Sequence, residues 1–374
     1  MNIEKFRQSP YNGKVAALVK AADSLRTDKE EPVDVTFNEV IEQTYGHVEK
    51  EPVTDMAGLM ESLGIDPSID TISAIVTVDD MDVRWLIPEI IREAIYTGLR
   101  EAPIWPNLVA SEQSISQKKV TMPFINLSDA VPHKVGEGET IPLGSISYGE
   151  KSIDTFKIGR GIKITYEIKQ FVSLDVVSIF FRDFGIRLGQ ALDTLAIDVL
   201  INGDQADGSS SAPVIGVTTP NTKVYKDYLR PWVRGARMGR KYNIIIGGEQ
   251  AALNTLDLKE FKDRQSGTPE AKLDMRTPIP NQASYFVHGN VPDNQEILLD
   301  NRFALIKYNV IPLRIEMDKV VSNQTEEYYA SLTLGFGKIF QDSVLLLDQT
   351  KDFATNGFPD YMEVDAFNDV HFGN

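Results

Sequence analysis

Residues 173–203 read SLDVVSIFFRDFGIRLGQALDTLAIDVLING and predict one helix that is much longer than any other element of the chain. Ser173 is a favourable N-cap, and the acidic Asp175 suits the positive end of the helix dipole. Asn202 and Gly203 form a good C-terminal stop. The helix therefore spans about 28 residues, which corresponds to roughly 42 Å.

Apolar side chains recur every three or four positions along this helix and define a face that must be buried. That face consists of Leu174, Val177, Phe181, Phe184, Leu188, Leu192, Leu195 and Val199. The central four, from Phe181 to Leu192, are the predicted core of the helix. A helix of this length with one apolar face needs a long, flat partner.

A second face of the same helix carries Ser178, Arg182, Gly185 and Gly189. Each glycine inside a helix costs about 1 kcal/mol relative to alanine. Two interpretations of this stripe stay open. Either another segment of the chain passes close over a smooth surface, or the glycines are incidental on a solvated face.

A long glycine-rich segment precedes the helix. Residues 118–125 predict a strand, and the alternating residues 161–168 predict the strand that pairs with it. Between them, residues 126–156 hold four glycines, two prolines and charges of both signs. Because such a long loop is uncommon inside a compact domain, a two-stranded arm that projects from the body is the simplest structure. An arm of this kind is not stable alone, so we expect it to need a neighbouring surface.

The first 80 residues are strongly acidic. They hold seven Lys/Arg and sixteen Asp/Glu, which gives a net charge of −9 out of −16 for the chain. An amphipathic piece at 15–25 and a turn at Gly64 interrupt a polar composition. We therefore expect an extended arm with short helices that needs a partner surface. A helix with one apolar face is predicted to follow from Pro88 onward.

The second half of the chain predicts a mixed α/β or α+β region in which strands outnumber helices. The expected elements are a surface loop at 204–220, a strand at 242–246, a helix at 249–258, a polar loop at 262–284, and strands near 297–299, 303–308, 313–317 and 328–340. The longest basic cluster consists of Arg234, Arg237, Arg240 and Lys241. We expect this cluster in a loop, solvated or paired with another subunit, rather than as a nucleic-acid site.

The composition argues against several classes of protein. The chain has no cysteine, which excludes disulfides, thiolate metal sites and thiol nucleophiles. Its four histidines lack metal-ligand spacing, and Gly247-Gly248 lacks the following Gly-Lys-Ser/Thr of a phosphate loop, so we expect no metal and no cofactor. No apolar run is long enough to cross a membrane, and the first residues lack the pattern of a secretory signal.

The order of the predicted elements resembles the major capsid proteins of tailed bacteriophages, which have the Hong Kong phage-type capsid fold. The resemblance covers residues 83–350. Its most specific stretches are Val135-Gly-Glu-Gly-Glu-Thr-Ile-Pro, Ile164-Thr-Tyr-Glu-Ile and Asp198-Val-Leu-Ile-Asn-Gly-Asp. Residues 242–253, YNIIIGGEQAAL, look like the strand and helix that open the axial domain of that family.

The resemblance implies an α+β chain in four parts. They would be an acidic N-terminal arm at 1–82, a peripheral domain at 83–221 with an extended E-loop at 126–158 and a spine helix at 173–201, an axial domain at 222–328, and a return to the peripheral domain with a C-terminal tail at 329–374. The E-loop would contact an adjacent subunit through Lys134, Glu137, Glu139, Pro142 and Lys151. The axial-domain loop, which includes Arg264 and Arg276, would lie near the axis of a capsomer.

The function that the resemblance implies is that of a coat protein, with no catalytic activity, that assembles into the icosahedral head of a tailed double-stranded DNA phage. Its partners would be copies of itself in hexamers and pentamers, a separate scaffolding protein, a portal and, as a further option, decoration proteins. The shell would enclose DNA without sequence-specific binding. It would be assembled in the host cytoplasm.

Two other functions stay open at this point. The same fold builds bacterial encapsulin compartments, whose shells enclose cargo proteins. The alternative from a different class is a carboxylate-dependent hydrolase, because a chain with 54 acidic residues always offers a pair such as Glu137 and Glu139. A monomeric protein would favour the hydrolase.

Overall fold

The structure is a computed structural model that describes residues 14–26, 36–46, 53–76, 86–101, 103–121, 123–125, 135–137, 140, 146–148, 152–204, 211–262, 279 and 283–363. Its helices are α2 (Val15–Arg26), α3 (Phe37–Tyr45), α4 (Met56–Ser62), α5 (Ile72–Val76), α6 (Leu86–Glu101), α7 (Trp105–Leu108), α8 (Tyr166–Phe171), α9 (Leu174–Asn202), α10 (Tyr225–Arg237), α11 (Glu249–Leu256), α12 (Lys259–Lys262) and α14 (Asp360–Glu363). Its strands are β1 (Val109–Ser114), β2 (Lys119–Val120), β3 (Pro123–Ile125), β4 (Ile146–Tyr148), β5 (Ile153–Asp154), β6 (Phe156–Thr165), β7 (Val214–Val217), β8 (Ile244–Gly247), β9 (Ser284–Val287), β10 (Gln295–Leu299), β11 (Leu305–Val320), β12 (Thr325–Lys338) and β13 (Val344–Asp352). The predicted α+β class is confirmed.

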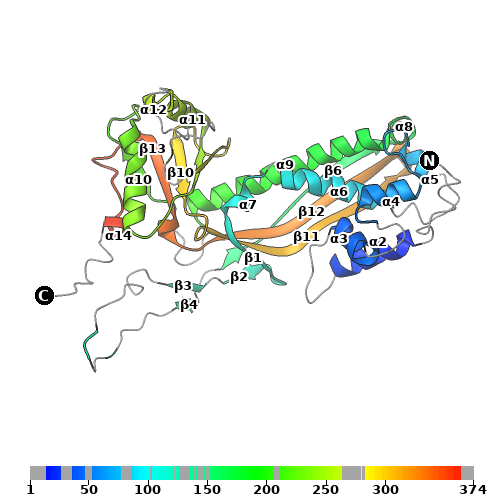
Figure 1. Ribbon diagram of the computed structural model, residues 1–374, viewed down its shortest axis with the longest axis horizontal. Helices are drawn as coiled ribbons and strands as arrows, with labels where there is room; N and C mark the ends of the chain where they lie inside the picture. Colours follow the sequence, from blue (N-terminus) through cyan, green and yellow to red (C-terminus); the bar gives the residue numbers. More distant parts are fainter. Residues whose placement is uncertain are drawn as a thin grey trace.

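The long helix α9 packs beside α6 over one face of a four-stranded sheet (Figure 1). The strand order is β1-β11-β12-β6, in which β11 and β12 form a long antiparallel hairpin and β1 runs parallel to β11. The four residues predicted as the core of the helix are all buried in the interior that α6, α9 and this sheet share: Phe181, Phe184, Leu188 and Leu192. The ring of Phe181 meets that of Tyr328 on β12 edge-on, with centroids 5.5 Å apart. We call this sheet with α6 and α9 the long unit.

The helices α2 to α5 lie at the far end of the long unit (Figure 1). Their apolar side chains belong to the same core as α6 and α9. A buried Nη1 of Arg26 on α2 donates to both carboxylate oxygens of Glu89 on α6, each at 3.0 Å. These segments form short helices, as predicted, but they pack on the chain's own helix α6 instead of extending away from the body.

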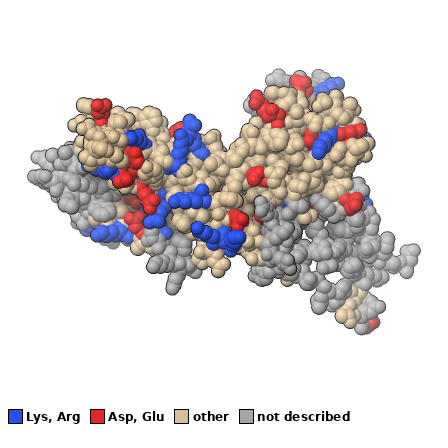
Figure 2. Space-filling view, turned by 180° about the vertical axis from the view of Figure 1, so that it is seen from behind, with Lys and Arg blue, Asp and Glu red and all other residues tan. Residues whose placement is uncertain are grey.

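A second sheet has five strands in the order β7-β13-β10-β8-β9. Along β8, Ile245 faces the core beneath α10, whereas Ile244 and Ile246 face the core shared with the long unit. This alternation is what a strand buried on both faces requires. We call this sheet with α10 and α11 the compact unit, and it meets the long unit at an angle, with a notch between them (Figure 2).

The pairs β2–β5 and β3–β4 are antiparallel and form a two-stranded arm, residues 119–154. The pair β3–β4 lies away from both sheets (Figure 1). The arm itself agrees with the sequence prediction, but the predicted pairing is wrong, because residues 119–125 pair with 146–154 and not with 161–168. Residues 156–165 instead form β6, which pairs with β12, and Tyr166 already begins α8.

Other elements of the second half also differ from the prediction. Arg234 and Arg237 lie in helix α10 and not in a loop, and β7 occupies part of the expected loop at 204–220. The predicted division between residues 328 and 329 does not follow the strand pairing. Strand β11 lies in the sheet of the long unit, and β13 returns to the sheet of the compact unit.

Candidate assembly surfaces

Helices α6 and α9 cross at glycines with their backbones in close contact. A Cβ atom on Gly185 would lie 2.1 Å from the carbonyl oxygen of Ile95, and one on Gly98 would lie 2.0 Å from that of Arg182. No side chain fits between such backbones. The close-approach interpretation of the glycine stripe is therefore confirmed, and the interpretation as a solvated face is wrong.

Arg182 on this stripe ties the two helices together at the surface. Its Nε donates to Oε2 of Glu101 at 2.6 Å, and its Nη2 donates to the other carboxylate oxygen. Hydrogen bonding and charge from Arg182 hold the pKa of Glu101 below its ordinary value. Both side chains are half exposed, so the pair adds little stability and mainly fixes the end of α6.

The buried Asp193 of α9 positions the start of the sheet. Its Oδ1 accepts hydrogen bonds from the backbone N–H groups of Ile104 and Trp105, at 2.8 and 2.7 Å. Burial raises the pKa of this carboxyl, and the two backbone hydrogen bonds oppose that rise. The spine helix thereby fixes the turn α7, which leads into β1 and then into the arm.

Among its described residues, the arm is anchored to the long unit at its root. Ile153 is buried there together with Tyr308 of β11, and Thr155 donates its backbone N–H and its hydroxyl to the carbonyl oxygen of Lys118. Further out, the side chain of Ile146 is 74% exposed. The described part of the arm therefore contains an apolar side chain that the chain's own core does not cover.

The structure describes one of the five residues predicted to act between subunits. Glu137 lies in an exposed turn of the arm. The other four lie outside the described residues: Lys134, Glu139, Pro142 and Lys151. The two axial-loop residues, Arg264 and Arg276, also lie outside them, so these assignments stay predictions.

A further apolar surface occurs where α8 meets the first turns of α9. Phe171, Ile179 and Phe180 all expose more than half of their side chains. Monomeric proteins rarely expose several large apolar side chains together. This surface has no separate signal in the sequence, where the helix shows one apolar face and one face of small residues.

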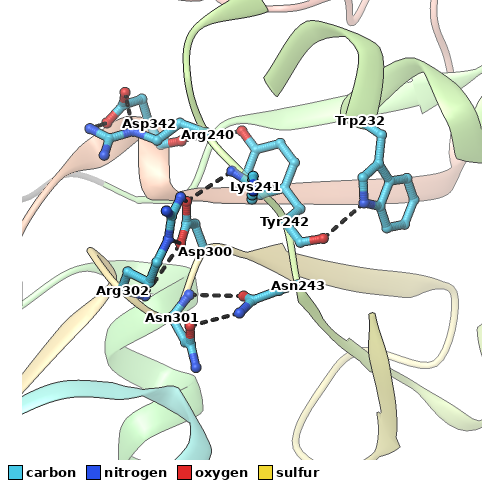
Figure 3. Close-up of polar contacts among 9 residues, drawn as sticks. All are labelled: Trp232, Arg240, Lys241, Tyr242, Asn243, Asp300, Asn301, Arg302 and Asp342. Atoms are coloured by element: carbon cyan, nitrogen blue, oxygen red, sulfur yellow. Dashed lines mark hydrogen bonds and ion pairs between the residues drawn. The ribbon is translucent and has the colours of Figure 1, made fainter. Parts of the chain in front are cut away.

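A polar network fixes the junction between the long unit and the compact unit (Figure 3). Arg240 donates from Nε and Nη2 to the two carboxylate oxygens of Asp342, each at 2.8 Å. Asp300 accepts from Nε and Nη2 of Arg302 at 2.9 and 2.6 Å, and from the backbone N–H of Lys241 at 2.9 Å. Burial would raise the pKa of Asp300, but these hydrogen bonds outweigh burial and hold it below its ordinary value.

The same network joins the two segments that connect the units. Asn243 and Asn301 exchange hydrogen bonds at 2.7 and 3.1 Å, and Asn301 also donates to the carbonyl oxygen of Asn107 in the long unit at 3.1 Å. The connecting segments 300–304 and 339–343 bond to one another through backbone groups at both of their ends. These hydrogen bonds therefore link the compact unit, the two connecting segments and Asn107 of the long unit at the junction.

Lys338 lies buried next to this junction, at the end of β12. Its backbone N–H donates to Asp204, just after α9, at 2.6 Å. Burial lowers the pKa of its side chain to about 8, although the charges of Asp204 and Asp342 oppose that fall. The junction thus contains a lysine whose charged form is destabilised by burial.

Charged side chains of both signs lie on the surface of the long unit. Figure 2 shows basic and acidic side chains interspersed along one face of the long unit. Among the residues that the structure describes, no cluster of three His, Cys, Asp or Glu could hold a metal ion. Of the helices in the described ranges, none is long and apolar enough to pass through a membrane.

The fold of the chain is similar to that of several solved structures. No model of a protein family matches the sequence, and no curated protein sequence matches it. A virus-like particle from Pyrococcus furiosus is similar at 12% identity and a TM-score of 0.46, over 70% of this chain and 98% of that chain. The mature capsid of bacteriophage PhiM1 is similar at 10% identity and a TM-score of 0.46, over 66% of this chain and 86% of that chain. The capsid of an empty GTA particle is similar at 14% identity and a TM-score of 0.46, over 64% of this chain and 87% of that chain.

The order of elements in the structure is the order that the resemblance to the Hong Kong phage-type capsid fold implies: a projecting arm, a long helix along a sheet, and a compact unit with its own sheet. The residues of the junction were missed by sequence reasoning. Short polar segments between strands carry no signal that distinguishes a fixed junction from a solvated turn.

Proposed function

We propose that the chain is the coat protein of an icosahedral shell, the major capsid protein of a tailed double-stranded DNA bacteriophage. The arm is the observation that carries this proposal. It is a two-stranded ribbon anchored at its root, with Ile146 largely exposed further out. A ribbon of two strands is marginally stable in water, so it needs the surface of another molecule. In a closed assembly of identical copies, each copy supplies that surface to its neighbour.

The construction of the rest of the chain supports the same proposal. The close backbone contact at Gly185 and the junction at Asp300 and Arg240 make the two units one piece of fixed shape. A subunit of fixed shape can repeat the same contacts many times. The exposed apolar side chains near Phe171 and Phe180 provide a second surface that another copy would cover.

The proposed protein is structural and not an enzyme. Its copies form hexamers and pentamers, with the arm acting between subunits through Lys134, Glu137, Glu139, Pro142 and Lys151, and with the loop of Arg264 and Arg276 near the capsomer axis. A separate scaffolding protein and a portal complete the head, with decoration proteins as a further option. The shell forms in the host cytoplasm and becomes the capsid of the virion, where it encloses DNA without reading its sequence.

Electron microscopy of the purified protein tests this proposal. Negatively stained samples of the protein, produced alone in a bacterial host, should contain closed shells, or the ring-shaped capsomers from which shells are built. Sedimentation of the same sample should place most of the protein in large species. A uniform population of monomers, with the 41.7 kDa mass of a single chain, would contradict the proposal.

A further inference from the structure

One face of helix α10 is basic, although the chain as a whole carries a net charge of −16. Four cationic residues follow one another there at intervals of three or four, which places them on the same side of the helix: Lys226, Arg230, Arg234 and Arg237. Val233 lies among them with 70% of its side chain exposed.

This face is one wall of an open groove with an aromatic floor. The guanidinium of Arg230 lies 4.3 Å from the ring centre of Phe353, and that of Arg234 lies 4.9 Å from that of Phe358. Arg230 also donates to Asp227 at 3.1 Å, and Arg234 donates to the carbonyl oxygen of Met362 at 3.2 Å. These contacts hold both inner arginines in place, and the groove has a volume of about 390 Å³.

Helix α11 of the same unit presents the complementary surface. Leu253 and Leu256 point outward with 55% and 56% of their side chains exposed. Acidic residues border them: Glu249 at the start of α11, and Asp257 and Glu260 beyond its end, with Lys259 as a basic neighbour. An apolar centre with acidic ends therefore matches a groove with an apolar floor and basic walls.

We propose that α11 of one copy lies in the α10 groove of an adjacent copy. This inference rests on the proposed function, because it names the contact by which compact units join around a capsomer. Two different surfaces of the same unit meet, so the contact is head-to-tail, and such contacts generate rings when the rotation closes. The lengths are compatible, since α11 has 8 residues, or roughly 12 Å, and α10 has 13 residues, or roughly 20 Å.

A protein segment suits this groove better than a nucleic acid does. A phosphate backbone is normally held by an extended array of free cationic groups. Here the two inner arginines already contact Asp227, Met362 and the aromatic floor, and the floor itself is apolar. An amphipathic helix with acidic ends satisfies both the floor and the walls.

Cross-linking tests the contact directly, because the chain has no cysteine of its own. A variant with Val233→Cys and Leu253→Cys carries one thiol on each surface. After assembly and treatment with a short bis-maleimide, a denaturing gel should show a ladder of multimers. Either single variant should give far fewer multimers, because each contact then lacks one thiol. The matched control is Val233→Cys with Ile179→Cys. It places one thiol in the groove and the other at an exposed apolar position of α9 that lies outside the proposed contact, so it should give no ladder.

Charge reversal provides the second test. Lys226→Glu with Arg237→Glu cancels the positive charge of the groove, and Glu249→Lys with Asp257→Lys makes the surface of α11 basic, like the groove, so each variant alone should lose at least tenfold in assembled material. Equal mixing of the two should restore part of the assembly, because the acidic α11 surface of the first variant then meets the basic groove of the second. Circular dichroism of both variants should match that of the unmodified protein.

The outcomes separate this inference from the proposed function. If the unmodified protein forms no particles, the proposed function fails and the inference fails with it. If particles form but the Val233–Leu253 pair gives no ladder, or the control pair gives the same ladder, only the inference is overturned. Unchanged assembly of both charge-reversed variants would also overturn it.

Discussion

The arm and the spine helix α9 are both long and extended, yet they are stabilised in opposite ways. Helix α9 buries its apolar face in a core that includes α6 and the four-stranded sheet. The described part of the arm has a single small anchor at Ile153 and exposes Ile146 beyond it. Apolar burial supplies most of the free energy of folding, so the first element is stable within one copy. In the proposed function, the second element gains its surface from a neighbouring copy.

The length of an element therefore says little about where its stability comes from. The long unit would fold in an isolated protomer, whereas the arm would gain its order from a neighbour. Changes in the arm should therefore affect assembly, whereas changes in the core of α9 should affect the folding of the protomer.

Replacement of residues 130–149 by a short Gly/Ser turn should abolish assembly. The contacts described above within the long unit and the compact unit do not involve these residues, so thermal unfolding of the variant should stay cooperative, with a Tm close to that of the unmodified protomer. Sedimentation and electron microscopy measure the loss of particles, and calorimetry measures the Tm. Normal particles from this variant would show that the arm does not act between copies.

Phe184→Ala should have the opposite effect, on the stability of the protomer. Phe184 is 5% exposed, and its truncation should leave a cavity that costs about 3–5 kcal/mol. Phe180→Ala is the matched control, because that side chain lies one turn away on the same helix and is 66% exposed. Urea unfolding of protomers should give a small change for the control. Similar changes for the two variants would mean that the buried face of α9 is wrongly assigned.

The burial of Lys338 at the junction should make the stability of the protein depend on pH. Below about pH 8, Lys338 is charged in the folded and unfolded states, and the folded state bears the cost of its burial. Between about pH 8 and the ordinary pKa of 10.5, the folded state binds fewer protons than the unfolded state, so the stability contributed by this group rises with pH.

Lys338→Met removes this titration. The free energy of unfolding of the unmodified protein, relative to the variant, should therefore rise by on the order of 3 kcal/mol across that pH window. Urea unfolding of both proteins at a series of pH values measures the difference. A difference that does not change with pH would show that burial does not perturb this lysine.

Gly185→Ala tests the close contact between α6 and α9. The added Cβ would overlap the carbonyl oxygen of Ile95, and we expect a loss of about 1–3 kcal/mol, reduced in part by the better helix propensity of alanine. Gly189→Ala is the control, because its Cβ would lie 3.3 Å from the side chain of Pro103. The control should be neutral or slightly stabilising. Equal stability of the two variants would contradict the contact.

The sequence predicts local elements of this chain better than pairings between distant ones. The helix at 173–201 agrees with α9 within one residue at each end, because its cap and its apolar spacing are local signals. The pairing of β6 with β12 joins residues more than 150 positions apart, and no local pattern specifies it. Helix α10 was missed because Pro231 and Gly235 weaken its local helix propensity, while the burial of Tyr228 and Trp232 stabilises it.

The candidate surfaces also differ in whether the sequence predicts them. The arm could be predicted, because glycines, prolines and an improbable loop length are visible in the sequence. The junction and the groove of α10 could not, because they depend on side chains such as Arg240 and Asp342, which the fold brings together over a separation of 102 positions.

Hydrogen–deuterium exchange of the arm tests the contrast between the two elements most directly. The same protein is measured as assembled particles and as dissociated protomers, with peptides from β3–β4 and from α9 followed in both. We expect slow exchange of α9 in both states, and slow exchange of the arm only in the particles. Equal protection of the arm in particles and protomers would contradict the claim that its stability comes from a neighbouring copy.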